Sequence, residues 1–309
     1  MRRFLVRLFT SLMPFSFVSC GDNPDRPDSS DNSVIPAVNL GDDPAGKNMG
    51  IGLYDDSKFI NGDCVTYYCN TNEDLFNSET EIKGILVEFP GLGGSSCIGG
   101  RINMGQYVSE LTTRCAENGI VVAYMFPGPW SWGNRAAVRM TDSVVTALKD
   151  KYSLPDDFSL VVCGGSMGGL GALNYAADTA YRNNLEGVVA ACPCIDVLDR
   201  FAAAPSYPRT FVSAVASYDM PLTEALKSIS PAHRIAEMPD VPYFICSDGA
   251  DEVFPEAQCD KYVDALKARD LNVIYYQQPG LKHGEFTEQI KGSLHDFIVQ
   301  KALAGRGKV

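Results

Sequence analysis

Long apolar runs, histidine, tryptophan and basic residues are all scarce in this sequence. No stretch reaches the roughly 18 consecutive apolar residues of a membrane-spanning helix, which excludes a conventional transmembrane segment. The 26 Lys and Arg residues are outnumbered by 38 Asp and Glu residues, and the net charge of −12 repels nucleic-acid phosphates, so no nucleic-acid partner is expected. Only three histidines are present and none has a second ligand at zinc-site spacing, so we expect no metal and no cofactor.

Length and composition favour a single folded domain with a tail. Of the 309 residues, 45% are hydrophobic and 21% are charged, which is enough apolar material to bury a core. The ten cysteines suit an exported protein but show no obvious disulfide framework. Pairings of Cys64 with Cys69 and of Cys97 with Cys115 stay open, whereas Cys163 lies in an apolar run and is predicted to be a buried thiol.

The first 20 residues have the features of a targeting segment. Arg2 and Arg3 form a short basic region, residues 4–18 are mostly apolar, and Ser19 precedes Cys20. This pattern resembles a bacterial lipoprotein signal, which predicts that Cys20 is lipidated. The protein would then be exported and anchored to a membrane of a bacterial cell envelope, with surface exposure as a further option. A plain secretory signal and an ordinary N-terminal helix remain as alternatives.

Residues 21–46 change abruptly in composition. Six aspartates and four prolines are interleaved here with a single basic residue, Arg26. Such a segment has too few apolar side chains to pack, so it is predicted to be a disordered acidic tether. The folded catalytic domain is then expected over residues 47–309.

From residue 83 onward, short apolar runs alternate with longer helical patterns. The expected strands cover residues 85–89, 120–124, 159–163, 187–191, 242–246 and 272–276. The expected helices cover residues 106–118, 134–151, a segment after 166, 256–268 and 285–304, and a helical insertion at 196–235 is a candidate lid. This alternation predicts an α/β fold with a mainly parallel sheet and helices on both faces. In such sheets the functional site lies at the carboxyl ends of the strands.

A glycine-rich turn at residues 164–169 contains Ser166 in a G-x-S-x-G pattern, between a predicted buried strand and an alanine-rich helix. In this context the pattern predicts a nucleophile elbow, in which a sharp turn exposes the serine hydroxyl at the edge of the sheet. A glycine-rich turn with no catalytic role is the alternative.

A serine hydroxyl needs a general base, and that base needs a carboxylate to orient it. The chain order Ser, acid, His of α/β hydrolases is satisfied by Ser166, Asp251 and His283. Asp251 and His283 each follow a predicted strand and are expected at the same edge of the sheet. Asp248 and Glu252 are rival candidates for the acid.

The tetrahedral intermediate of such a reaction needs N–H donors for its oxyanion. Met167, the residue after the serine, is one expected donor. The second is expected in the glycine-rich loop at residues 89–94, where Leu92 is the preferred candidate. A turn without this role is again the alternative.

These features together resemble the α/β-hydrolase superfamily, in particular stand-alone relatives of the prolyl-oligopeptidase catalytic domain. The resemblance covers residues 83–303 and implies a hydrolase fold with a small helical cap and a serine mechanism. One departure is Pro90-Gly91, because the family often has His-Gly in this loop. The motifs that carry the resemblance are the elbow, Ser230-Pro231, residues 251–255, Pro279-Gly280 and His283-Gly284.

Both tryptophans of the chain lie in one loop, residues 127–135, which follows the second strand of the repeat. Trp130 and Trp132 are expected to form the wall of an acyl or sugar pocket, with Arg135 available to an anionic or carbonyl group. Aromatic packing that only fixes a proline-rich loop is the alternative.

The function predicted from the sequence is a serine hydrolase that forms an acyl-enzyme, with small or carbohydrate-linked carboxylic esters as preferred substrates. A serine peptidase acting on short peptides is the enzymatic alternative. A propeller like that of full prolyl oligopeptidases would need roughly 160 residues. About 60 lie between Cys20 and the first strand of the repeat, so none is expected there. A non-catalytic surface lipoprotein that binds glycans is the third hypothesis.

Overall fold

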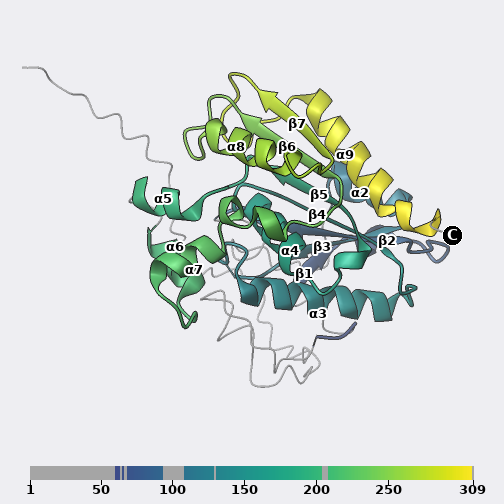
Figure 1. Ribbon diagram of the computed structural model, residues 1–309. Helices are drawn as coiled ribbons and strands as arrows, with labels where there is room; N and C mark the ends of the chain where they lie inside the picture. Colours follow the sequence, from purple (N-terminus) through teal and green to yellow (C-terminus); the bar gives the residue numbers. More distant parts are fainter. Residues whose placement is uncertain are drawn as a thin grey trace, which may run out of the picture. The chain divides into compact units, whose positions relative to one another are not determined.

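The computed structural model describes residues 60–62, 65, 68–92, 108–128, 130–203 and 208–307 (Figure 1). The predicted signal segment, the proposed lipidation site Cys20 and the acidic tether at residues 21–46 lie outside these residues and stay predictions. No helix in the described ranges is both long and apolar enough to cross a bilayer.

A seven-stranded sheet with the order β1-β3-β2-β4-β5-β6-β7 forms the centre of the fold. Only β1 is antiparallel, to β3, and the other neighbouring strands are parallel. The predicted α/β fold with a mainly parallel sheet is therefore confirmed. The strands are β1 Cys69–Thr71, β2 Gly84–Phe89, β3 Ile120–Met125, β4 Ser159–Gly165, β5 Leu185–Ala191, β6 Tyr243–Asp248 and β7 Val273–Gln278.

The central strands are mostly apolar because both of their faces are covered. Leu86 of β2 is fully buried and pairs in register with Val122 of β3 and Val161 of β4. Strand β1 was not predicted from the sequence. It has only three residues, two of them polar, which is too short for a periodic pattern to stand out.

Helices cover both faces of the sheet, in two layers that are visible in Figure 1. One apolar core includes side chains of α2 and α9, and a larger core on the other face includes side chains of α3, α4 and α8. These helices are α2 Glu110–Glu117, α3 Arg135–Lys151, α4 Met167–Asp178, α8 Glu256–Lys267 and α9 Glu288–Ala302. Short 3-10 helices cover Glu73–Leu75, Arg182–Asn184, Pro231–His233, Ile235–Glu237 and Ala304–Gly307.

Several helix ends follow directly from capping residues. Asn134 accepts a hydrogen bond from Ala137 and starts α3 where the sequence predicts it. Thr287 caps α9 in the same way, so this helix begins three residues later than the predicted position 285. The capping side chains therefore set the boundaries that hydrophobic periodicity leaves uncertain.

The insertion between β5 and β6 is helical as predicted. It contains α5 Val197–Ala203, α6 Pro208–Val215 and α7 Leu222–Ser228, which Figure 1 shows grouped to one side of the sheet. Buried side chains of this cap, among them Phe211 and Leu226, share a third apolar cluster with Met167 and Leu170 of α4. The cap thus packs directly against the helix that follows Ser166.

Candidate active site

Ser166 lies between the last residue of β4 and the first residue of α4. Its backbone has φ 59° and ψ −123°, which is an unfavourable conformation for a residue with a side chain. Such a conformation costs on the order of 1–3 kcal/mol and persists only where the surroundings enforce it. A hydrogen bond from the Ser166 N–H to the carbonyl of Ala191, at 2.8 Å, helps to enforce it here. The turn therefore has the geometry of a nucleophile elbow.

The glycines of the turn allow strand, helix and neighbouring loop to approach one another. A Cβ on Gly164 would lie 2.4 Å from the carbonyl oxygen of Gly168, and a Cβ on Gly168 would lie 2.1 Å from the carbonyl oxygen of Phe89. Both contacts are with backbone atoms, which cannot move aside cheaply. Residue 168 must therefore be glycine for α4 to pack against the loop that follows β2.

We expect Gly168→Ala to lower the free energy of unfolding by about 3 kcal/mol, the upper end of the usual range for overpacking. Gly292→Ala is a matched control within α9, because nothing lies within 4 Å of its added Cβ. It is expected to leave stability unchanged or to raise it by up to about 1 kcal/mol. Denaturant unfolding measures the free energy of unfolding of both variants. Equal stability of the two variants would contradict the close packing at the elbow.

His283 links Ser166 to Asp251 through its two ring nitrogens. The distance from His283 Nε2 to Ser166 Oγ is 2.9 Å, and from His283 Nδ1 to Asp251 Oδ2 it is 2.7 Å. Because an ionised carboxylate only accepts hydrogen bonds, Nδ1 carries the proton and Nε2 accepts from the serine hydroxyl. The structure thus brings together the three side chains that the sequence singled out for catalysis.

Asp251 is held firmly by its surroundings. Its side chain is only 2% exposed, and its Oδ1 accepts hydrogen bonds from the backbone N–H groups of Val253 and Phe254 at 2.7 and 2.9 Å. The ring of Phe254 packs edge-on against His283, with ring centroids 5.3 Å apart. These contacts leave Oδ2 as the oxygen that faces the imidazole.

The two rival acids occupy different positions. Glu252 is exposed to solvent. Asp248 is buried and accepts a hydrogen bond from the backbone N–H of Gly284 at 2.9 Å, next to His283 in sequence. The carboxylate at hydrogen-bond distance from the imidazole is that of Asp251. The geometry therefore supports Asp251 as the acid, and Asp248 contacts the backbone of the histidine loop instead.

The two expected oxyanion donors lie on elements that meet at the serine. Met167 is the first residue of α4, where helix N–H groups lack partners within the helix. A Cβ added to Gly91 would lie 3.9 Å from Ser166 Cβ, so the loop after β2 reaches the serine just before Leu92. Residues 93–107 lie outside the described chain. The oxyanion role of Met167 and Leu92 remains a prediction that this placement supports.

The tryptophan loop only partly matches its prediction. Trp132 is fully buried, packs on Phe211 with ring centroids 4.5 Å apart, and donates a hydrogen bond to the Thr210 hydroxyl at 3.2 Å. A side chain with no accessible surface cannot line an open pocket, so the prediction for Trp132 is wrong. Trp130 is half-buried against the same apolar cluster, and its pocket role stays a prediction.

Arg135 is exposed at the start of α3. Its guanidinium group lies over the ring of Tyr218, 4.5 Å from the ring centroid, and its backbone N–H donates to the Tyr218 hydroxyl at 2.8 Å. Tyr218 belongs to the cap, so these contacts join the cap to the tryptophan loop. The predicted interaction of Arg135 with a substrate stays a prediction.

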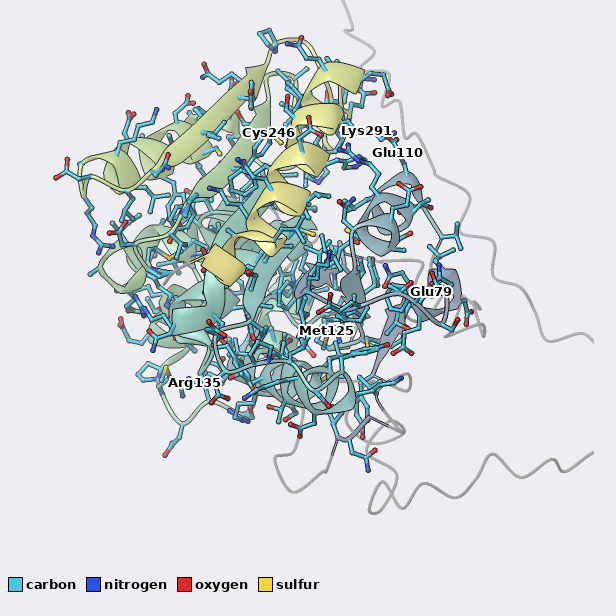
Figure 2. The ribbon with its side chains drawn as sticks, turned by 90° about the vertical axis from the view of Figure 1, so that its right-hand side faces the viewer. Glu79, Glu110, Met125, Arg135, Cys246 and Lys291 are labelled. Atoms are coloured by element: carbon cyan, nitrogen blue, oxygen red, sulfur yellow. The ribbon has the colours of Figure 1, made fainter. Side chains whose placement is uncertain are left out.

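A cavity of about 410 Å³ lies on the α2 and α9 side of the sheet and reaches Gly165, directly before the serine. The ion pair between Glu110 and Lys291, at 2.6 Å, is part of its lining, and Figure 2 shows these two side chains close together. Most of the remaining wall is apolar. It includes Leu111, Val189, Ala191, Phe286 and Leu294.

The cysteines in the described part of the chain are free and buried. This includes Cys69 and Cys115, for which pairing was left open, and it confirms the buried thiol predicted for Cys163. Burial raises the pKa of the Cys115 thiol to about 12, so this thiol is unreactive at neutral pH. No cluster of metal-binding side chains occurs among the described residues.

Two residues near the triad were not recognised as functional from the sequence. Cys192 has φ 45° and its thiol donates to Asp248, while Gln278, the last residue of β7, donates to the other oxygen of Asp248. Gln278 is the second of two glutamines that end β7, and this polar end of the strand was its only sequence signal. The cysteine offered no comparable signal.

Comparison with protein families agrees with this geometry. The model of the prolyl oligopeptidase family matches residues 136–300, more than half of the chain. The chain belongs to the prolyl oligopeptidase family. The predicted family resemblance is thus confirmed, and the protein is assigned to a family of hydrolases. A comparison with curated proteins found no match.

Solved structures share the fold of this prolyl oligopeptidase family member at low sequence identity. A puromycin hydrolase matches with a TM-score of 0.59 and 18% identity over 75% of this chain and 35% of that one. A puromycin-hydrolyzing peptidase of Mycobacterium tuberculosis matches with a TM-score of 0.57 and 17% identity, over 74% of this chain and 35% of that one. Esterase B of Lactobacillus rhamnosis matches with a TM-score of 0.52 and 15% identity, over 74% of this chain and 80% of that one. The chain therefore spans about a third of the length of the two puromycin-hydrolysing proteins, and the shared feature is the α/β-hydrolase fold.

Proposed function

We propose that this protein is a serine hydrolase that cleaves carboxylic esters through an acyl-enzyme. Ser166 acts as the nucleophile, His283 as the general base and Asp251 as the carboxylate that orients the histidine. The observation that carries the proposal is the hydrogen-bonded chain from Ser166 Oγ through the imidazole to Asp251, with distances of 2.9 and 2.7 Å. A serine hydroxyl acquires nucleophilic character only when a base is placed in this way.

In the proposed reaction, Ser166 Oγ forms a bond to the ester carbonyl carbon while its proton passes to His283 Nε2. The π electrons of the carbonyl move onto its oxygen, which the N–H groups of Met167 and Leu92 stabilise. Collapse of this intermediate breaks the bond to the alcohol oxygen, which takes the proton from His283 and leaves. Water then attacks the acyl-enzyme in the same sequence of steps, so that the acid is released and Ser166 regains its proton.

An apolar acyl group suits the surroundings of the serine. The buried side chains of Met167 and Phe254 belong to one apolar cluster beside the triad. The cavity that reaches Gly165 has mostly apolar walls, and its described lining includes none of the three triad residues. Pockets of this volume are typical of small-molecule sites. These features support small carboxylic esters, including acyl groups carried on carbohydrates.

A serine peptidase acting on short peptides is the second candidate, and the family match favours it. Similar structures are named for the hydrolysis of puromycin, which makes puromycin a useful probe of this alternative. The glycan-binding hypothesis relied on both tryptophans being available to a sugar. The full burial of Trp132 weakens it.

A fluorophosphonate probe and a substrate panel test the proposal. We expect the probe to label Ser166, and we expect kcat/KM to be higher for p-nitrophenyl esters and for acetylated or feruloylated oligosaccharides than for peptide anilides or puromycin. An amine is a poorer leaving group than an alcohol, so we expect this site to favour esters. Faster cleavage of anilides would assign a peptidase, and a folded protein that the probe does not label would support a binding role.

A further inference from the structure

The carboxyl group of Asp248 accepts hydrogen bonds from three donors at the end of β6. Its Oδ2 accepts from Cys192 Sγ at 2.7 Å and from the backbone N–H of Gly284 at 2.9 Å. Its Oδ1 accepts from Gln278 Nε2 at 2.7 Å. The residue is only 1% exposed, and a buried carboxyl group requires partners of this kind. Burial raises the pKa of the Asp248 carboxyl, while the bonds from Cys192 and Gly284 oppose the shift.

Gln278 extends this set of contacts along the histidine loop. It pairs in register with Asp248 across β6 and β7, so both side chains start from adjacent strand ends. Its Nε2 also donates to the carbonyl of Glu285, and its Oε1 accepts from the N–H of Thr287, each at 3.3 Å. Together the two side chains bond the backbone at residues 284, 285 and 287, immediately after His283.

The loop that carries His283 has little regular structure of its own. Gly280 and Gly284 both have positive φ angles, and the His283 side chain is 22% exposed. The position of the imidazole therefore depends on what holds the loop backbone. A displacement of about 1 Å in a catalytic group lowers the rate by about a hundredfold.

We propose that Asp248 is a positioning residue that, together with Gln278, fixes the loop of His283 and thereby sets the distance between the imidazole and Ser166. The proposal rests on the proposed function of the triad. Asp248 does not touch the reacting atoms, and it acts only through the loop backbone. The site then uses two aspartates for separate tasks, with Asp251 orienting the ring and Asp248 placing the loop.

The hydrogen-bond pattern makes a sharp test available. All three partners of Asp248 are donors, so an asparagine at this position would direct its NH₂ group at one of them. If the asparagine oxygen keeps the hydrogen bond from the Gly284 N–H, its NH₂ group faces Gln278 Nε2. Two donors then face each other, and the hydrogen bond is lost. Exchanging Gln278 for glutamate at the same time restores an acceptor at that point.

We expect Asp248→Asn to lower kcat on a p-nitrophenyl ester by about 10- to 100-fold with little change in KM. We expect the double variant Asp248→Asn with Gln278→Glu to recover part of that loss, because the glutamate accepts from the asparagine NH₂ group but gives up the bond to the carbonyl of Glu285. A role limited to stability would change the melting temperature but not kcat of the folded protein. Thermal unfolding of every variant is therefore measured alongside the kinetics.

Asp142→Asn serves as the matched control. This carboxyl group, on α3, accepts hydrogen bonds from the Thr179 hydroxyl at 2.6 Å and from the N–H of Ala180 at 3.1 Å, and burial raises its pKa too. It bonds no part of the histidine loop through these contacts. Its variant is expected to keep the kcat of the unchanged protein.

These measurements decide whether Asp248 positions the loop of His283. Recovery of kcat in the double variant supports the proposal. A wild-type kcat for Asp248→Asn overturns it, and so does a loss as large as that of Asp251→Asn without recovery, since Asp248 would then be the catalytic acid. If Asp248→Asn does not fold, Gln278→Met removes a loop contact and leaves the carboxylate, and an unchanged kcat for that variant overturns the proposal. Activity retained by Ser166→Ala would instead refute the proposed function itself.

Discussion

Replacing Ser166 with alanine is expected to lower kcat on p-nitrophenyl esters by about a millionfold, because without the hydroxyl there is no acyl-enzyme to form. The fold should be unaffected. Alanine keeps the Cβ that the strained turn already accommodates at φ 59°, and the backbone bond to Ala191 does not involve the side chain. The hydrogen bond that the alanine variant loses at this point is the one to His283.

Steady-state kinetics and thermal unfolding of the purified variant test this expectation. Ser143→Ala is a suitable control, since this hydroxyl donates to the backbone carbonyl of Arg139 on α3 and Ser143 is not part of the triad. It should retain full activity. Esterase activity that persists in a Ser166→Ala preparation free of wild-type enzyme would contradict the assignment of the nucleophile.

The main elements of this fold were predictable because its sheet is buried on both faces. Runs such as Val121-Val122 and Val161-Val162 are fully buried in β3 and β4, the parallel strands on either side of β2, and this burial demands the continuous apolar sequence that makes them visible. The elbow was predictable for a related reason. Its glycines are required by backbone contacts as close as 2.1 Å, so the sequence pattern reports the packing directly.

The triad was predictable from chain order, since Asp251 and His283 follow consecutive strands of the parallel sheet and must meet at one edge. The orientation of Trp132 was not. Its φ angle of 46° turns the ring toward Phe211 and the cap, and no local pattern encodes a contact with a residue 79 positions away. Side chains that face one another across long separations become known only once the helices of the cap are placed.

The contacts of Asp248 show the same limit. From sequence, Asp248 stays a rival to Asp251, because both acids follow the same predicted strand and lie three residues apart. They differ because the chain turns after β6, so that one carboxylate faces the imidazole and the other faces the backbone of Gly284. The distinction depends on the path of a loop, which residue types alone do not determine.

Replacing Asp251 with asparagine is expected to lower kcat by about 10⁴-fold, the effect of holding the histidine in the wrong tautomer. The N–H groups of Val253 and Phe254 will keep the asparagine oxygen at the position of Oδ1, which leaves its NH₂ group facing His283 Nδ1. Nδ1 must then accept a hydrogen bond, so the proton moves to Nε2. A protonated Nε2 cannot take the proton of Ser166.

The comparison with two neighbouring acids makes this prediction specific. Glu252→Gln changes an exposed carboxylate one residue away and should leave kcat unchanged. The kcat of Asp248→Asn should lie between those of Asp251→Asn and Glu252→Gln, because this change displaces the loop of His283 without altering the tautomer. Measurement of kcat for the three variants on one ester tests this order. If Asp248→Asn is the more damaging change, the acid of the triad is Asp248, and the 2.7 Å contact between Asp251 and His283 is not the one that orients the base.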